Sequence, residues 1–363
     1  MDAAAAEHLW HSLAPPGIAG PAWRWSNSEL EPALRAVGTA GAVLLARVAA
    51  LSDEYRQQLE AELCCREAVS TAALDGVLID SREARMLALK RLRAGRAAAA
   101  PDEESAGAAL HGLIDLLADA SGNPGPMSET RLRVWHRGLF PSGAGVPSRA
   151  WPEAGIGPFL HWFNGTGHAS KSGLDAPLRC GIAQLWFETQ RPFEDGNGRI
   201  GRALGEQALI VGQATPAEGR IARIQALSPV FLRRQRDYQD QLEAARRGES
   251  PDITPWLLFV AACMIEADTE ALRCIDRMMQ IAWFWVRHRG TPLNDRQRKA
   301  LDSVLSSDPL DGGWLTNRLY SQLTQCPSAV TASRDLTQLE QLGLIRRDPG
   351  AGGRSTRYEV VLS

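Results

Sequence analysis

The stretch Arg191-Pro-Phe-Glu-Asp-Gly-Asn-Gly-Arg-Ile-Gly-Arg202 is the most informative part of this 363-residue chain. Gly196 and Gly198 allow a tight turn whose backbone N–H groups point at a single spot. Apolar residues at helical spacing follow at once, from Ile200 to Leu209, so the positive N-terminus of a helix faces the same spot. The stretch therefore predicts an anion site, and the alternative is a charged helix cap without a ligand.

The charged side chains of this stretch suit a phosphate group and a divalent cation. Arg199 and Arg202 supply fixed cations for phosphoryl oxygens, and Asp195 supplies the hard oxygen ligand that Mg²⁺ prefers. We therefore predict Asp195 as a metal ligand. The predicted nucleotide- or phosphate-binding residues are Phe193, Gly196, Asn197, Gly198, Arg199 and Arg202.

Composition excludes several classes of protein. The net charge of −2 provides no global basic field for nucleic acid or an acidic membrane. The chain shows neither a basic segment followed by an apolar stretch at its start nor a run of 18 apolar residues, so we expect no export signal and no membrane span. The six cysteines lie in helix-like apolar contexts without CxxC or His spacing, which favours reduced thiols in a cytoplasmic protein.

Hydrophobic periodicity predicts an all-α protein in three parts. We expect an N-terminal helical domain over residues 1–100, a helical bundle over 106–290 and a separate domain over 293–363, with a polar linker at Pro101–Ser105. Helical spacing occurs at Leu30–Leu51, Tyr55–Ala73, Arg82–Ala98, Ala106–Ala120, Met127–Phe140, Gly157–Asn164, Pro177–Gln190, Gly201–Gly212, Ser228–Gly248 and Thr254–His288.

The last 70 residues change in style. Helices are predicted at Asp295–Ser306, Leu315–Cys326 and Ser328–Leu342, followed by two alternating strands around the Gly-rich turn Asp348–Gly353. Three helices with a two-stranded wing make a winged helix. From Asn294 onward the chain has nine Lys/Arg and eight Asp/Glu. A net charge of +1 gives little electrostatic support for DNA binding, because several phosphates must be neutralised for useful affinity. The alternatives are DNA binding and a protein-protein or dimerisation surface.

The central stretch closely resembles the signature of the Fic family, HPFxDGNGRxxR, whose members mostly transfer AMP from ATP to a protein hydroxyl. The resemblance implies a Fic-type helical bundle, with ATP or another phosphorylated ligand and Mg²⁺. In that family the leading His is the general base. Here Arg191 stands in its place, and an arginine side chain is not deprotonated in a protein. We therefore predict that Arg191 holds a phosphate or substrate carboxylate and does not act as a base.

The resemblance extends over roughly residues 20 to 363, to a subfamily with an inhibitory helix of pattern [ST]xxxE[GN]. The matching segment is Thr71-Ala-Ala-Leu-Asp75-Gly76, with Asp in place of Glu. Because this carboxylate is one methylene shorter, we expect its contact with Arg202 to be weakened or mediated by water. The alternative is that Asp75 only ends a helix. Further similar segments are Trp23–Trp25, Glu67–Gly76, Phe159–Asn164, Leu185–Phe187, Asp252–Trp256, Leu293–Arg298 and Gly352–Thr356.

A second departure from the family concerns the β-hairpin flap that presents the target's hydroxyl. Between Leu139-Phe-Pro141 and the Trp-Phe-Asn helix this chain has only Ser142–Pro158, which holds four Gly and three Pro. Such a segment does not form a hairpin with long edges. The shortened flap counts against ordinary protein AMP transfer.

The missing base leaves other candidates by chain position. His161 lies on a predicted helix near the signature, and His136 precedes the shortened loop. Arg191 has an alternative too, which is an ion pair with Glu188 or Glu194 at the surface.

Three functional classes remain. We favour a diverged transferase acting on a nucleotide or another phosphorylated compound. The alternative is an inactive nucleotide-binding regulator that acts through the winged helix or a partner interface. A structural protein with an empty relic site is the third class, and the joint presence of Asp195, Asn197 and both arginines argues against it. Candidate partners are a phosphorylated small molecule, a protein, a second copy of the chain, and DNA, but not a membrane.

Overall fold

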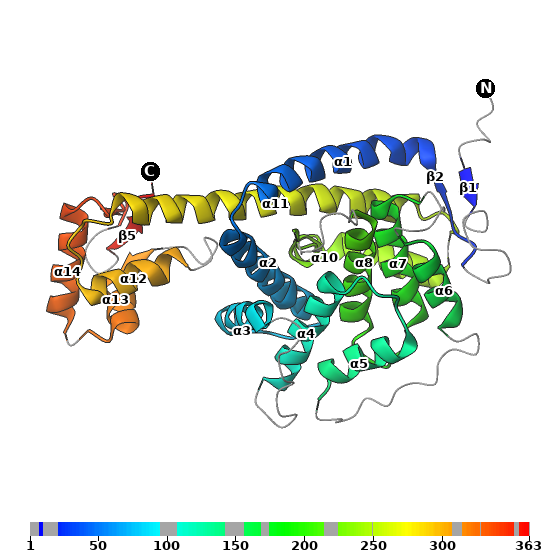
Figure 1. Ribbon diagram of the computed structural model, residues 1–363, viewed down its shortest axis with the longest axis horizontal. Helices are drawn as coiled ribbons and strands as arrows, with labels where there is room; N and C mark the ends of the chain where they lie inside the picture. The colour runs from blue at the N-terminus through cyan, green and yellow to red at the C-terminus, as the bar shows by residue number, and fades with distance from the viewer. Residues whose placement is uncertain are drawn as a thin grey trace. The chain divides into compact units, whose positions relative to one another are not determined.

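The chain is predominantly α-helical, which confirms the predicted all-α class (Figure 1). The computed structural model describes residues 7–9, 21–94, 107–141, 156–167, 174–213, 224–248, 250–306, 314–326, 328–351 and 356–362. Contacts divide the chain into two units, Met1–Cys274 and Ile275–Ser363. The first unit contains the N-terminal helices and the predicted bundle up to Cys274, and the three-domain division stays a prediction.

Unit 1 begins with a short antiparallel strand pair in which Glu7 lies opposite Ser26. Its elements are β1 (Glu7–Leu9), β2 (Arg24–Ser26), α1 (Asn27–Ala49), α2 (Asp53–Leu74), α3 (Ser81–Ala94), α4 (Ala108–Gly122), α5 (Glu129–Leu139), α6 (Gly157–Gly165), α7 (Ala176–Gln190), α8 (Asn197–Gln213), α9 (Ser228–Arg233) and α10 (Gln235–Arg247). The helix α11 (Thr254–Arg287) starts in unit 1 and ends in unit 2.

The helices α7 and α8 form the centre of unit 1 and lie side by side in Figure 1. Both are apolar around most of their circumference, so burial on all sides follows. Arg179, fully inside this core, ties the helices together by donating to the carbonyl oxygens of Ala208 and Phe163, both at 2.7 Å. Burial lowers the pKa of the Arg179 guanidinium to about 10. The pair α7–α8 is therefore a rigid support for the loop that joins them.

A buried carboxylate fixes α2 in the same core. Glu67, 3% exposed, accepts from the backbone N–H of Ser228 at 3.0 Å and from its hydroxyl. Ser228 is the first residue of α9, so the carboxylate of Glu67 also lies at the positive end of that helix. The contact fixes the position of the second half of α2, which carries Thr71 and leads to Asp75.

The helix α1 is, within the described part of the chain, the one helix long and apolar enough to cross a membrane. We predicted no such segment from the sequence, because the criterion was an uninterrupted run of 18 apolar residues and charged residues such as Glu29 and Arg35 interrupt α1. Leu30 and Val37 of this helix pack into the core of unit 1. Length and composition alone therefore do not identify α1 as a membrane span.

Unit 2 contains the predicted three helices but one strand more than predicted. Its elements are α12 (Asp295–Leu305), β3 (Leu315–Thr316), α13 (Asn317–Thr324), α14 (Ala329–Gln341), β4 (Ile345–Arg347) and β5 (Arg357–Val360). The strands form an antiparallel sheet in the order β3-β5-β4. The predicted start of the second helix at Leu315 was wrong, because Leu315 and Thr316 pair with β5, and Thr316 caps the helix that begins at Asn317.

Some predictions concern segments outside the described residues. They are the linker Pro101–Ser105, most of the shortened flap Ser142–Pro158 and most of the segment Gly352–Thr356. The predicted thiols lie within the description. All six cysteines are thiols, and five of them are buried, which agrees with the predicted reduced state.

Candidate phosphate-binding site closed by Asp75

The loop between α7 and α8 owes its shape to glycine and to one asparagine. Gly196 has φ +78°, and a Cβ there would lie 2.9 Å from Cε2 of Phe140, so only glycine fits. Asn197 closes the loop, because its Oδ1 accepts from the N–H of Phe193 at 3.0 Å and its Nδ2 donates to the carbonyl of Phe193 at 2.6 Å. The side chain of Asn197 thus orders the loop, and the N–H groups that begin α8 have no intrahelical acceptor.

Phe193 anchors the loop in the core. Its ring is 1% exposed and stacks on the imidazole of His136, with ring centroids 4.1 Å apart. Burial lowers the pKa of His136, although a hydrogen bond to the Asp195 backbone opposes the shift. His136 is therefore neutral near pH 7, and its Nε2 has no hydrogen-bond partner within the described structure. Of the two candidate bases, His136 lies against the loop while His161 is exposed on α6.

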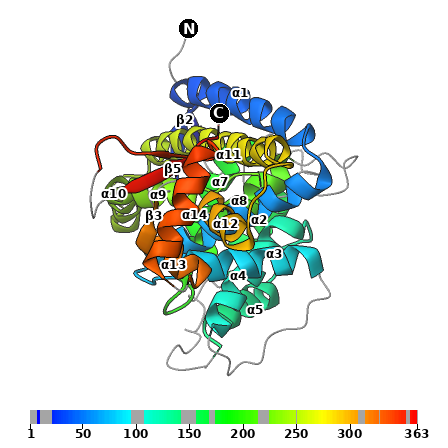
Figure 2. The same ribbon diagram turned by 90° about the vertical axis from the view of Figure 1, so that its left-hand side faces the viewer.

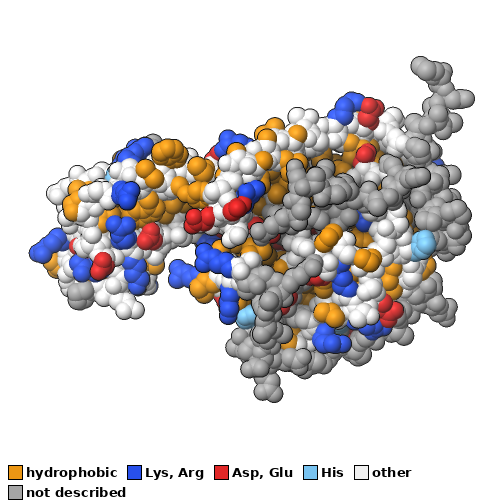
Figure 3. All heavy atoms as spheres, in the orientation of Figure 1, with side chains coloured by type: hydrophobic (Ala, Val, Ile, Leu, Met, Phe, Trp, Pro, Cys, Tyr) orange, Lys and Arg blue, Asp and Glu red, His pale blue; other side chains and the backbone are white. Residues whose placement is uncertain are grey.

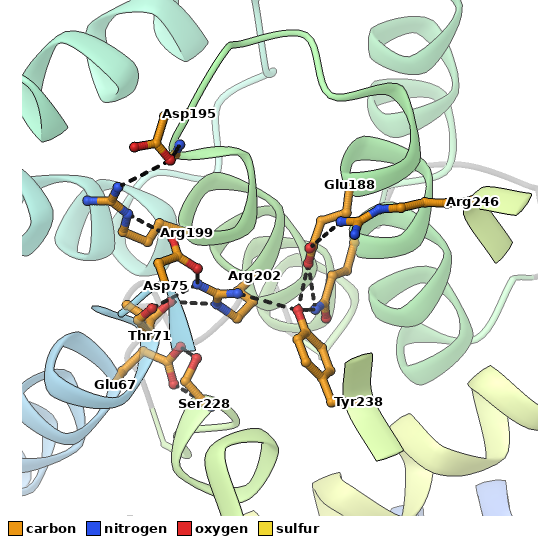
Figure 4. Close-up of polar contacts among 12 residues, drawn as sticks. Glu67, Thr71, Asp75, Glu188, Asp195, Arg199, Arg202, Ser228, Tyr238 and Arg246 are labelled. Atoms are coloured by element: carbon orange, nitrogen blue, oxygen red, sulfur yellow. Dashed lines mark hydrogen bonds and ion pairs between the residues drawn. The ribbon is translucent and has the colours of Figure 1, made fainter. Parts of the chain in front are cut away.

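The carboxylate of Asp75 contacts both signature arginines directly, as Figure 4 shows. Its Oδ2 accepts from Nε of Arg199 at 3.0 Å, and its Oδ1 accepts from Nη2 of Arg202 at 2.8 Å. The contact is direct, so the prediction of water mediation was wrong, and a weakening of the contact stays a prediction. Side-chain length alone did not decide it, because the end of α2 comes close enough for the shorter carboxylate. Asp75 also follows the last residue of α2, with Gly76 next at φ +79°, so ending the helix and pairing with arginine occur together.

Gly198 makes this close approach sterically feasible. A Cβ at this position would lie 2.8 Å from Nη1 of Arg202 and 2.9 Å from Oδ1 of Asp75. A side chain would therefore push apart the two groups that form the ion pair. The second glycine of the signature stretch is needed for the contact with α2 as well as for the turn.

Arg202 is held on α2 by a second residue. Its Nε donates to the hydroxyl of Thr71 at 2.6 Å, and its Nη2 donates to the Thr71 carbonyl at 2.8 Å. The guanidinium is fully enclosed, and burial opposes its charge, but Tyr238, Asp75 and Glu188 nearby hold the pKa of Arg202 above its ordinary value. Thr71 and Asp75, both predicted as inhibitory residues, thus meet at the same arginine.

A buried polar cluster that the sequence analysis did not predict lies behind Arg202. Tyr238 donates to Oε1 of Glu188 at 2.7 Å, Gln184 donates to both, and Arg246 lies 3.7 Å from the same carboxylate (Figure 4). Burial raises the pKa of Glu188, and it also raises the pKa of Tyr238. The available signal was the spacing of four between Gln184 and Glu188 on an otherwise apolar helix.

Asp195 lies at the open side of the loop. Its carboxylate is 61% exposed, its Oδ1 accepts from the N–H of Gly196 at 2.6 Å, and the same oxygen is 3.9 Å from Nη2 of Arg199. No group of three or more His, Cys, Asp or Glu side chains in the described residues is arranged to hold a metal ion. Asp195 is therefore an exposed carboxylate outside any such cluster, and its role as a metal ligand stays a prediction.

Arg191 caps α7 in a left-handed conformation, with φ 45° and its N–H bonded to the carbonyl of Phe187. This conformation costs a non-glycine residue on the order of 1–2 kcal/mol. The side chain is exposed, and no ion pair joins Arg191 to Glu188 or Glu194 among the described residues, which contradicts the alternative of a surface ion pair. The role of Arg191 in holding a phosphate or carboxylate stays a prediction. Glu188 is instead turned inward toward Tyr238.

Comparison with known proteins gives limited matches. Residues 20–93 match the model of a domain of unknown function, DUF4172. No curated protein matches the chain. Fourteen chains of solved structures do, among them a crystal structure of a Fic family protein from Desulfovibrio desulfuricans G20. That protein is 18% identical, the match covers 96% of this chain and 98% of that one, and the TM-score is 0.43.

Proposed function

We propose that unit 1 is a Fic-like domain that binds the phosphate groups of a nucleotide or another phosphorylated compound at the N-terminus of α8. The observation that carries the proposal is the contact of one carboxylate, Asp75, with both Arg199 and Arg202. Two arginines that converge on one anionic group beside a helix N-terminus suit a phosphate equally well. Asp75 occupies this position, so a phosphorylated ligand must displace it.

The donor set fits ATP and Mg²⁺. Arg199 and Arg202 would hold phosphate oxygens, and Asp195 would supply one carboxylate to the cation, with the remaining ligands from phosphates and water. When bound, Mg²⁺ would neutralise part of the phosphate charge. Asn197 contributes by fixing the loop, since its side-chain groups are bonded to Phe193.

The general base of ordinary AMP transfer is missing. Arg191 does not replace it, because an arginine side chain does not act as a base in a protein, and His136 is buried beneath the loop against Phe193. We therefore favour a diverged transferase acting on a phosphorylated compound, by a route that does not need a base at position 191. The alternative is an inactive nucleotide-binding regulator. One feature favours this alternative, because Asp75 would contact the arginines without ligand and leave them when a ligand binds, which gives the protein two states that a ligand can switch.

Calorimetry with ATP and with inorganic pyrophosphate, each with and without Mg²⁺, tests the proposal. We expect weak binding to the wild-type chain, tighter binding to Asp75→Ala and a loss of binding in Arg199→Ala. Glu54→Ala, which removes an exposed carboxylate from the same helix α2, is the matched control and leaves binding unchanged. Equal binding by Asp75→Ala and wild type, or none by either, would contradict the proposal. Mass spectrometry of the incubated mixture then separates the two alternatives, because only a transferase forms a product.

A further inference from the structure

Unit 2 presents a short helix–turn–helix beside a small sheet. The helices α13 and α14 are joined by the residues 325–328, and Gln325 turns the chain in a left-handed conformation with φ 52°. The strand β4 follows α14 and pairs with β5. This is the arrangement in which the second helix of the pair is presented to a partner.

The inner face of α14 is firmly packed. Ala332, Leu336 and Leu339 are buried in the core of unit 2. Asp335, 4% exposed, accepts from the hydroxyl of Tyr320 at 2.8 Å and from Nε of Arg296 at 2.9 Å. These contacts fix the rotation of α14 about its axis and therefore decide which residues point outward.

The outer face of α14 is exposed, polar and hollowed. Its residues are Ala329, Val330, Ser333, Arg334, Thr337, Gln338 and Gln341, and together they line one shallow depression. We call these seven residues the α14 face. None of the seven is acidic, and the exposed Glu340 of the same helix lies next to Gln341. Arginine and glutamine form paired hydrogen bonds with guanine and adenine edges, serine and threonine bond to several bases, and small apolar groups contact the thymine methyl.

Two exposed arginines lie near the α14 face. Three acidic residues of unit 2 are already paired, Asp335 with Arg296, Asp348 with Arg357, and Glu359 with Arg346. Arg334 on α14 and Arg318 on α13 are exposed, and neither forms an ion pair within the described residues. Lys and Arg side chains lie at several places on the visible surface of unit 2 in Figure 3, and Figure 2 shows α13 and α14 toward the viewer. Each of these pairs uses one arginine as well as one carboxylate, so the net charge of the tail stays at +1, and the positive charge near the α14 face is that of Arg334 and Arg318.

We propose that the α14 face binds the major groove of double-stranded DNA. An α-helix fits that groove, and Arg334, Thr337 and Gln338 lie one turn apart on its outer side. Arg318 supplies a phosphate contact from the neighbouring helix. A protein partner is the less favoured occupant, because cores of protein interfaces are apolar and aromatic, while Val330 is the one large apolar residue of this face. The inference is independent of the function proposed for unit 1.

Fluorescence anisotropy of the full chain with labelled duplexes tests this inference. Duplexes selected from a randomised pool are titrated at low and at moderate salt. We expect binding that weakens as salt rises, because bound counterions are released from the phosphates. Arg334→Ala should weaken binding on the order of 10-fold or more and relax the base preference at one position. Arg318→Ala should weaken binding to all sequences alike and flatten the salt dependence.

Arg35→Ala on α1 is the matched control, since it also removes one exposed arginine and should leave DNA binding unchanged. Circular dichroism of each variant checks that the fold is retained. Absence of duplex binding by the wild-type chain at low salt would overturn the proposal. So would equal losses in Arg334→Ala and Arg35→Ala. A change in oligomeric state on Arg334→Ala, without a change in DNA affinity, would identify the α14 face as a protein interface instead.

Discussion

Asp75 and Arg202, 127 positions apart in the chain, are joined by a 2.8 Å hydrogen bond between Oδ1 and Nη2. The guanidinium is 3% exposed and the carboxylate 19%, so the pair lies mostly out of water. Such a pair stabilises the fold less by its own attraction than by preventing an uncompensated buried charge. The contact therefore links the stability of unit 1 to the occupancy of its candidate ligand site.

Removal of the Asp75 carboxylate should destabilise the protein and create a dependence on anions. Asp75→Ala leaves Arg199 and Arg202 without their shared acceptor, and we expect a loss of about 2–3 kcal/mol in the free energy of unfolding. Inorganic phosphate should restore much of this loss by binding the folded state only. Urea denaturation with phosphate, and with chloride at equal ionic strength, measures both effects. An anion-insensitive Asp75→Ala variant would contradict the assignment of this site.

A methyl group at Gly198 should separate the ion pair. Its Cβ would lie within 3 Å of both Arg202 and Asp75, so Gly198→Ala should cost about 1–3 kcal/mol despite its better helix propensity. Gly38→Ala, inside α1 and with no atom within 4 Å of the added Cβ, is the control and should gain about 0.5–1 kcal/mol. Equal effects of the two substitutions on the denaturation midpoint would mean that the close approach is unimportant.

The hydroxyl group of Tyr238 should contribute measurably to the stability of unit 1. Tyr238→Phe removes the donor at 2.7 Å from Glu188 and leaves a buried carboxyl group less satisfied. We expect a loss of about 1–2 kcal/mol in the free energy of unfolding. Tyr55→Phe on α2, a part-exposed tyrosine, provides the control and should change stability little. Calorimetry of thermal unfolding measures both variants, and equal losses of stability in Tyr238→Phe and Tyr55→Phe would contradict the prediction.

Asp268 on α11 should make stability fall with rising pH. Burial raises its pKa to about 7, and the side chain is 4% exposed. Between about pH 4 and pH 7 the folded chain keeps a proton that the unfolded chain releases, so stability is greatest below this window and decreases through it, by at most about 1.4 kcal/mol per pH unit.

Asp268→Asn removes this titration, so its advantage over the wild-type chain should grow from pH 4 to pH 7 and then level off. Asp237→Asn, at an exposed carboxyl group, is the control and should follow the wild-type pH dependence. A constant difference between Asp268→Asn and wild type across the window would show that Asp268 is ionised throughout.

Restoration of histidine alone should not restore AMP transfer. The loss of a general base costs about 10²–10⁴-fold in rate, and Arg191→His returns a base without a docking edge for the target chain. We expect no labelling by an ATP analogue in the wild-type chain and little in Arg191→His, with or without Asp75→Ala. Strong labelling in the double variant, abolished by Arg202→Ala, would show that the base and Asp75 were the only obstacles.

Local features of the candidate site followed from the sequence. The turn at Gly196 and the presence of a helix after it depend on backbone preferences within a few residues, and such preferences are carried by the residue types themselves. The start of that helix was not predicted correctly, because the sequence placed it at Gly201 and the structure places it at Asn197. The three helices of unit 2 were predictable for the same reason, since their caps and apolar spacing are local. The strand β3 was missed because its partner strand β5 lies more than 40 residues further along the chain, beyond the reach of local sequence patterns.

Only the tertiary structure decided which groups meet. The residue types identified Asp75 and Arg202, but the distance between them depends on where α2 ends relative to α8, and the buried contact of Glu67 with Ser228 helps to fix that position. The inward turn of Glu188 toward Tyr238 is a result of packing too. Sequence periodicity specifies which face of a helix is buried, whereas the pairing of two buried polar groups is set by the translation and rotation of whole helices against one another.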